Sequence, residues 1–245
     1  TIYPVLLVSR LRRTPRVYDA HELFTEMKEV VTRPAIHRLW TWVEKTTVPR
    51  FRHGYTVSRS IAGELQRRYG VQYEVIRNIA PLSPPAGKDR PVPENVSAPR
   101  PLLYQGAVNE GRGLEFLIPA MQQVDGVLWI CGDGNFMQQA RALVKKLSLE
   151  DKVLFKGMLL PEELSQITPR AFIGINLVEP TGLNQLYSLT NKYFDYIQAG
   201  LPQITMDFPE YASINKEYEV AVLLNTLSVS SIVEKINLLA ANAVL

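Results

Sequence analysis

The sequence predicts an α/β protein with two doubly wound, parallel-sheet domains, of which the first is incomplete. Three observations lead to this prediction: short apolar runs alternate with helical patterns, prolines concentrate between residues 81 and 101, and the charge changes sign across that segment. Strands that alternate with helices are typical of βαβ units and therefore of a parallel sheet. The 245 residues are enough for one large domain or two modest ones.

The second half of the chain has the clearer pattern. Six short apolar runs predict strands at residues 102–104, 127–131, 153–155, 171–177, 203–206 and 220–224. Helical patterns follow Gly113 and Gly134, another helix begins at Pro161, and three more are expected at 191–199, 210–217 and 228–241. Six strands with helices between them make a complete doubly wound domain over residues 101–245.

The first half, residues 1–80, contains fewer elements. Strands are expected at residues 16–19 (buried), 55–57 and 73–76, and helices at 34–47 and from the Ser58 cap to the Gly70 stop. The first helix has an apolar stripe that includes Trp40, which we expect in the core, whereas Trp42 is expected at an interface. Three strands are too few for an independent doubly wound domain. We therefore expect further strands before Thr1 and interpret the chain as a fragment.

Composition divides the chain at the same place. Seven of the seventeen prolines lie in residues 81–101, which predicts a semi-rigid linker over residues 81–100. Residues 1–100 carry 17 Lys/Arg and 9 Asp/Glu (net +8), whereas residues 101–245 carry 10 and 15 (net −5). The single cysteine, Cys131, indicates a reducing compartment, and no apolar run is long enough to cross a membrane. We expect a cytoplasmic protein.

A glycine-rich segment follows the first strand of the second domain. Gly106, Gly111 and Gly113 form a G-x4-G-x-G pattern that matches neither the dinucleotide fingerprint nor the Walker A motif. Glycines at a strand-to-helix turn let a phosphate approach backbone N–H groups, and Arg112 adds a cation that can bind a diphosphate. The alternative is a glycine-rich turn with a surface arginine. Gly132 belongs to a second turn at the same edge of the sheet, where open α/β sheets bind ligands.

Three further groups have side chains that can act in a sugar site. His21 lies between two acidic residues after a predicted strand and could transfer a proton or bind a sugar hydroxyl; the alternative is a structural histidine. Lys192 and Asp195 share a helix face, next to Asn191, and could contact a phosphate and a ribose, or form a solvated ion pair. With three histidines and one cysteine, no group has metal-ligand spacing.

Four stretches, taken in order, resemble the retaining glycosyltransferases of family 4, which have the GT-B fold. These stretches are Tyr18-Asp19-Ala20-His21-Glu22-Leu23-Phe24, Tyr104-Gln105-Gly106 to Gly111-Arg112-Gly113-Leu114-Glu115, Ile130-Cys131-Gly132-Asp133-Gly134, and Asn191-Lys192-Tyr193-Phe194-Asp195-Tyr196 to Ala199-Gly200-Leu201-Pro202. The resemblance implies that the C-terminal domain binds a nucleotide-sugar and the N-terminal domain an acceptor. It also implies transfer with retention of configuration and without a required metal or other cofactor.

The resemblance assigns roles to individual positions. Arg112 matches the family's diphosphate contact, and His21 matches its histidine near the reacting sugar. Ala107 stands where a second basic residue is usual, a contact that Lys192 could replace. The family's two glutamates correspond to Glu179 and Asp195, which lie sixteen residues apart (195 minus 179), farther than is usual.

The sequence thus predicts a glycosyltransferase that moves a sugar from a nucleoside-diphosphate sugar to a saccharide or lipid-linked acceptor, in cell-envelope polysaccharide or glycolipid synthesis. The catalytic candidates are His21 and Glu179; the donor-binding candidates are Gly106, Gly111, Arg112, Gly113, Gly132, Asn191, Lys192 and Asp195. Two alternatives stay open, a nucleotide-sugar epimerase of the same fold and a non-catalytic nucleotide-sugar-binding module. The basic first half suggests peripheral contact with an anionic membrane, and no nucleic-acid partner is expected.

Overall fold

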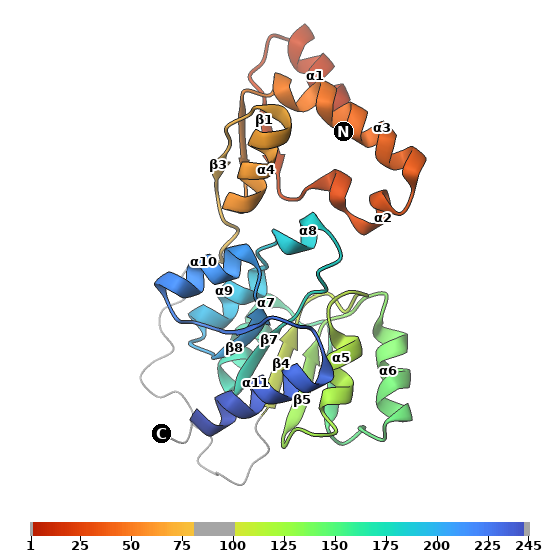
Figure 1. Cartoon of the computed structure of the whole chain (residues 1–245), viewed down its shortest axis with the longest axis vertical. Helices are drawn as coiled ribbons and strands as arrows, with labels where there is room; N and C mark the ends of the chain where they lie inside the picture. The colour runs from red at the N-terminus through yellow and green to blue at the C-terminus, as the bar shows by residue number, and fades with distance from the viewer. Residues whose placement is uncertain (1, 81–100, 243–245) are drawn as a thin grey trace. The chain divides into compact units, whose positions relative to one another are not determined.

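The computed structural model describes residues 2–80 and 101–242, which form two compact units (Figure 1). The N-terminal unit comprises residues 1–78 together with two short returns of the chain, residues 180–189 and 208–210. The C-terminal unit comprises residues 79–179, 190–207 and 211–245. The predicted linker, residues 81–100, lies outside the described residues.

The C-terminal unit contains a six-stranded sheet in which every neighbouring pair is parallel. Its strands are β4 (Pro101–Gln105), β5 (Val127–Cys131), β6 (Val153–Gly157), β7 (Ile173–Asn176), β8 (Gln203–Met206) and β9 (Val222–Leu224). The order β6-β5-β4-β7-β8-β9 is the doubly wound order, 3-2-1-4-5-6 when the strands are counted within the domain. The six predicted strands and the parallel α/β class are confirmed.

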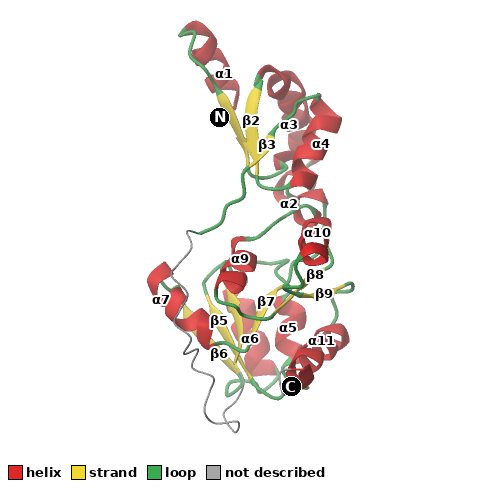
Figure 2. Cartoon of the chain, turned by 90° about the vertical axis from the view of Figure 1, so that its left-hand side faces the viewer, coloured by secondary structure: helices red, strands yellow, loops and turns green. Residues whose placement is uncertain are grey.

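Helices cover both faces of this sheet, as Figure 2 shows. One face carries α5 (Leu114–Ala120), α6 (Met137–Lys146) and α11 (Val229–Asn242), which pack against one another. The other carries α7 (Pro161–Ile167) and α9 (Asn191–Gln198), the latter against β7 and β8. A sixth helix, α10 (Pro209–Glu217), precedes β9. Strands β4, β7 and β8 are buried throughout, which explains the apolar runs at the centre of the sheet.

The N-terminal unit has a smaller parallel sheet, ordered β1 (Val17–Ala20), β2 (His53–Thr56) and β3 (Glu74–Val75). Its helices are α1 (Ile2–Leu11), α2 (Lys28–Val31), α3 (Pro34–Thr47), α4 (Arg59–Tyr69) and α8 (Leu183–Leu186). The start and end of α4 are as the sequence predicts: the Ser58 hydroxyl accepts a hydrogen bond from the Ile61 amide, and Gly70 ends the helix with φ of 68°.

Two expectations for this unit are not met. The strand at residues 16–19 was expected to be buried, yet Val17 is 60% exposed because β1 lies at the edge of the described sheet. The apolar stripe of α3 also faces outward at Leu39, which is 56% exposed. Trp40 is only partly buried, edge-on to Phe24. Helix α3 therefore shows the predicted period but does not bury the predicted face. Within residues 2–80 and 101–242, no helix is long and apolar enough to cross a membrane.

Candidate functional site

The candidate site of the C-terminal unit lies where the strand order reverses. Strands β4 and β7 are neighbours, although two strands and three helices separate them along the chain. Loops that leave the carboxyl ends of two such strands diverge and open a crevice, the usual ligand position in doubly wound sheets. Here these loops are residues 106–113, after β4, and residues 177–182, after β7.

The glycine-rich loop after β4 requires glycines for two reasons: its backbone has positive φ angles, and neighbouring atoms leave little room for a side chain. Gly106, Gly111 and Gly113 have φ values of 113°, 77° and 74°, which other residues rarely adopt. A Cβ atom on Gly113 would also lie 2.7 Å from the Cβ of Leu177, on the loop after β7. The glycines thus let the loops after β4 and β7 approach each other closely, at the edge of the sheet where ligands usually bind.

A second loop, after β5, is joined to the first by several hydrogen bonds. The Val108 amide donates to the Asp133 carbonyl at 2.9 Å, and Asn109 and Asn135 each accept a backbone N–H from the other loop. Gly132 is required for this contact, because a Cβ there would lie 1.9 Å from the Gly106 carbonyl oxygen. The glycine-rich loop is therefore held in one position by its neighbour.

Most backbone N–H groups of the glycine-rich loop are already used. The amides of Gly106, Val108, Glu110, Gly111 and Arg112 all donate to partners within the protein. The sequence suggested that this backbone cradles a phosphate, but few of its donors are left for one. An anion at this loop would have to be bound chiefly by side chains.

Two cations lie at the loop: Arg112 is part of it, and Lys192 lies beside it. The Nζ atom of Lys192, in the first turn of α9, is 3.8 Å from the centroid of the Tyr104 ring, and its Cε atom is 3.5 Å from where a Cβ on Gly106 would be. Burial, together with the nearby Arg112 guanidinium, lowers the pKa of Lys192 to about 7, while Asp195 opposes the shift. Neither of the two charged side chains has a hydrogen bond or ion pair to any of the described residues.

Asp195 is held by a short chain of side chains. Thr168 donates from its hydroxyl to the Gln105 amide oxygen at 2.9 Å, and the Gln105 amide nitrogen donates to Asp195 Oδ2 at 2.9 Å. Burial raises the pKa of Asp195, although the Gln105 hydrogen bond and Lys192 both favour the charged form. One carboxylate oxygen is thereby fixed, and the other accepts no hydrogen bond from the described residues.

Glu179 lies three residues after the end of β7, beside the same loop. Its amide donates to the Gly111 carbonyl at 2.9 Å, and its Oε2 atom is 3.6 Å from where a Cβ on Gly111 would be. The structure therefore brings together the predicted residues Gly106, Gly111, Arg112, Gly113, Gly132, Glu179, Lys192 and Asp195. Asn191 is exposed at the start of α9. None of the described residues forms a cluster of His, Cys, Asp or Glu side chains suited to a metal.

His21 belongs to the other unit and has its own neighbours. It follows β1, and its Nδ1 atom forms a hydrogen bond with Asp19 Oδ1. The Tyr55 hydroxyl donates to the other oxygen of Asp19 at 2.9 Å, and this hydrogen bond raises the pKa of Tyr55. The sequence placed His21 between two acids, but only Asp19 is bonded to it.

Sequence reasoning missed four residues of these sites. Tyr104 and Gln105 belong to a stretch that resembles family 4, but neither was assigned a role in the site, although they contact Lys192 and Asp195. Thr168 and Tyr55 contact the sites from elements far away in the chain. Polar residues at the carboxyl end of a buried parallel strand were the only signal that could have indicated Gln105.

Comparison with known proteins defines the class to which this chain belongs. Residues 99–242 match the protein-family model described as Glycosyl transferases group 1, so the chain is a member of that family. No curated protein sequence matches it. Among solved structures, it is similar to HepE of Anabaena in complex with UDP and glucose, with a TM-score of 0.75 and 15% identity over 99% of this chain. The chain spans 66% of the length of that HepE chain.

Two other structures show the same fold. WaaG, a glycosyltransferase involved in lipopolysaccharide biosynthesis, has a TM-score of 0.63 and 17% identity over 93% of this chain and 66% of its own. Sucrose-phosphate synthase of Thermosynechococcus elongatus has a TM-score of 0.71 and 19% identity over 96% of this chain and 62% of its own. The predicted GT-B fold is thereby confirmed.

Proposed function

We propose that this chain acts as a glycosyltransferase that takes a sugar from a nucleoside-diphosphate sugar. The observation that carries the proposal is the pair of cations, Arg112 and Lys192, beside the glycine-rich loop. Burial is the main cause of the lowered pKa of Lys192, and the nearby Arg112 guanidinium adds to it, while the Asp195 carboxylate offsets part of the shift. A diphosphate beside both cations would add negative charge and stabilise their charged forms.

The leaving group explains how this arrangement would assist the reaction. Departure of the nucleoside diphosphate leaves an added negative charge on its terminal phosphate, and cations fixed beside that position stabilise the charge as it develops. Arg112 would bind two phosphate oxygens through its guanidinium, and Lys192 would act as a point charge. Ala107 supplies no cation, so Lys192 replaces the second basic contact that is usual in the family.

The remaining site residues would position the donor. Asp195, with one oxygen fixed by Gln105, would accept a hydrogen bond from a ribose hydroxyl through the other. Glu179, beside Gly111, would bind hydroxyls of the transferred sugar, and Asn191 would contact the donor from the start of α9. His21 would bind a sugar hydroxyl from the N-terminal unit. No metal or other cofactor is required in this scheme.

Retention of configuration, a saccharide or lipid-linked acceptor and a role in cell-envelope polysaccharide or glycolipid synthesis are parts of the same proposal. The resemblance to family 4 supports retention. The solved structures that share the fold include enzymes of lipopolysaccharide biosynthesis, such as WaaG, which supports the acceptor class. We place the protein in the cytoplasm, in peripheral contact with the inner face of the membrane.

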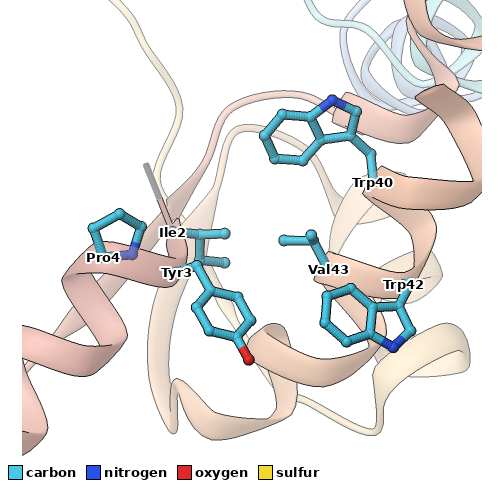
Figure 3. Close-up of a pocket in the computed structure, with 6 residues that line it drawn as sticks. All are labelled: Ile2, Tyr3, Pro4, Trp40, Trp42 and Val43. Atoms are coloured by element: carbon cyan, nitrogen blue, oxygen red, sulfur yellow. The ribbon is translucent and has the colours of Figure 1, made fainter.

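The surface of the N-terminal unit supports that membrane contact. Helices α1 and α3 enclose an apolar pocket of about 450 Å³, shown in Figure 3. It is lined by Ile2, Tyr3, Pro4, Trp40, Trp42 and Val43. Apolar side chains next to it are also exposed, among them Leu7 (52%) and Leu39 (56%), and the exposed Arg10 and Arg38 lie on the same two helices. Exposed aromatic and aliphatic side chains beside arginines suit an anionic membrane surface.

Incubation of a full-length protein with UDP-, GDP- and ADP-sugars, with and without candidate acceptors, tests the proposal. A glycosyltransferase releases the nucleoside diphosphate and forms a product that depends on the acceptor, and NMR of its anomeric proton shows whether configuration is retained. An epimerase would convert the donor without any acceptor. A binding module would bind the donor and leave it unchanged, and either of these results would contradict the proposal.

A further inference from the structure

His21 is part of a hydrogen-bonded chain of three side chains in the N-terminal unit. Asp19, on β1, accepts a hydrogen bond from His21 at one oxygen and from the Tyr55 hydroxyl at the other, the latter at 2.9 Å. The rings of His21 and Tyr55 lie edge to face, with their centroids 6.3 Å apart. Each carboxylate oxygen therefore has one donor, and the chain ends at the imidazole.

The parallel sheet explains why these side chains meet. Asp19 and Tyr55 are register partners in β1 and β2, so their side chains leave the same face of the sheet. Tyr18 points to the opposite face, where it packs on Phe51 and Tyr73 at centroid distances of 5.7 and 6.0 Å. His21 comes immediately after the last residue of β1, at the carboxyl end of the strands.

This geometry determines which nitrogen of the imidazole carries the proton. A neutral imidazole has one N–H and one acceptor nitrogen, and a carboxylate beside Nδ1 can only accept, so the proton belongs on Nδ1. Nε2 then has a free lone pair, and it has no hydrogen-bond partner in the described part of the chain. Glu22, next to His21 in the sequence, is exposed and is not bonded to it.

We infer that Asp19 and Tyr55 are positioning residues: Asp19 holds His21 with Nε2 as a hydrogen-bond acceptor for a sugar hydroxyl, and Tyr55 fixes Asp19 in that orientation. The inference rests on the proposed function for the identity of the ligand, but the state of the imidazole is a property of the free protein. A purely structural hydrogen bond between β1 and β2 would stabilise the sheet edge without selecting the tautomer of His21.

Long-range ¹H–¹⁵N NMR of the protein with ¹⁵N-labelled histidines, at pH 8.5, tests the tautomer directly. The chain has three histidines, so His21→Gln assigns the signals by loss, and His37 and His53 serve as internal references. We expect His21 as the Nδ1–H tautomer, whereas free imidazole side chains favour Nε2–H. Asp19→Ala should convert His21 to the reference pattern, and Tyr55→Phe should convert it partly. Glu22→Gln, the matched control, should change nothing.

Two results would overturn the inference: a wild-type His21 in the Nε2–H form, or an Asp19→Ala variant that keeps the Nδ1–H form while its circular dichroism is unchanged. The link to the reaction has its own readout. Asp19→Ala should lower kcat by about tenfold or more while the Kd for UDP stays the same. An unchanged kcat would refute the positioning role. A wild-type protein with no transferase activity would refute the proposed function and leave the tautomer result standing.

Discussion

The Nζ atom of Lys192 lies 3.8 Å from the centroid of the Tyr104 ring, over the face of a fully buried tyrosine. The Tyr104 hydroxyl donates to the Ala107 carbonyl at 2.6 Å, so the ring is fixed to the glycine-rich loop at its far end. An aromatic face attracts a cation but does not neutralise it as a carboxylate would. The contact therefore places a positive charge beside the loop and leaves that charge available to an anion.

Lys192→Met should make the fold more stable at or below neutral pH while it weakens binding of a nucleoside diphosphate. The pKa of Lys192 is about 7 in the folded protein, below the ordinary lysine value of about 10.4 that the unfolded chain has. Between these values the unfolded state binds more protons, so the free energy of unfolding rises with pH. Below pH 7 the buried Lys192 is charged in the folded protein, and this buried charge lowers the free energy of unfolding. Methionine has no charge, so the variant does not carry this cost.

Thermal unfolding from pH 6 to pH 9 measures this effect. We expect a higher Tm for Lys192→Met at pH 6.5, and a wild-type Tm that rises relative to the variant's as the pH increases from 7. Lys146→Met, at an exposed lysine in the last turn of α6, is the matched control and should leave both unchanged. A variant that is several degrees less stable at pH 6.5 would mean that Lys192 is a structural cation.

Asp195→Asn should reduce affinity for the ribose of the donor. The asparagine oxygen can still accept the Gln105 hydrogen bond, but an NH2 group, which cannot accept a hydrogen bond, then replaces the free oxygen, and a hydrogen bond to a charged group is worth about 1.5–3 kcal/mol. We expect a loss of roughly tenfold for UDP, and no loss for the deoxy-UDP that lacks the hydroxyl concerned, measured by calorimetry with 2′-deoxy- and 3′-deoxy-UDP. Equal losses for all three ligands would contradict the ribose assignment.

Gly132→Ala should disrupt the junction of the two loops. Its Cβ would lie 1.9 Å from the Gly106 carbonyl oxygen, and backbone cannot yield as a flexible side chain can. Gly157→Ala is the control, because Gly157 has a φ of 73° but nothing within 4 Å of the added Cβ. The control should lose roughly 1–2 kcal/mol through backbone strain alone. Urea titration should show a larger loss for Gly132→Ala, and similar losses would refute the close contact.

The exposed apolar surface of α1 and α3 should bind vesicles of anionic lipid. Trp42 is 55% exposed, so its fluorescence should shift to the blue when anionic vesicles are added, but not with neutral ones. Leu39→Ser should weaken the binding, and Glu29→Gln, at an exposed site outside the surface, should not. Co-sedimentation that is independent of anionic lipid would refute the membrane contact.

The elements of the C-terminal unit could be predicted from the sequence because its central strands, β4, β7 and β8, are buried throughout. Such strands are rich in apolar residues, and glycine or proline marks many of their ends. The position of the glycine-rich loop followed from the same pattern. The strand order could not be predicted from local sequence patterns, because the pairing of β4 with β7 joins residues about seventy positions apart.

The partners of the site residues could not be predicted for the same reason. Gln105, Thr168 and Asp195 are connected only after β4, the turn after α7 and α9 have packed together. The sequence predicted Lys192 as a donor-binding residue, with a solvated ion pair to Asp195 as the alternative. Its environment could not be predicted, since its contact with the buried Tyr104 ring depends on tertiary packing. In the N-terminal unit, the helical period of α3 was predicted correctly but not the exposure of its apolar face.

We propose that Arg112 and Lys192 together bind the diphosphate of a nucleotide-sugar. Calorimetric titration of UDP and GDP into the wild type, Arg112→Ala and Arg112→Lys tests it most directly. Loss of a charge-assisted, bidentate contact should weaken binding of the preferred nucleotide by roughly 10- to 100-fold in Arg112→Ala, and lysine should restore part of it. An Arg112→Ala protein that binds UDP and GDP as the wild type does would contradict the account.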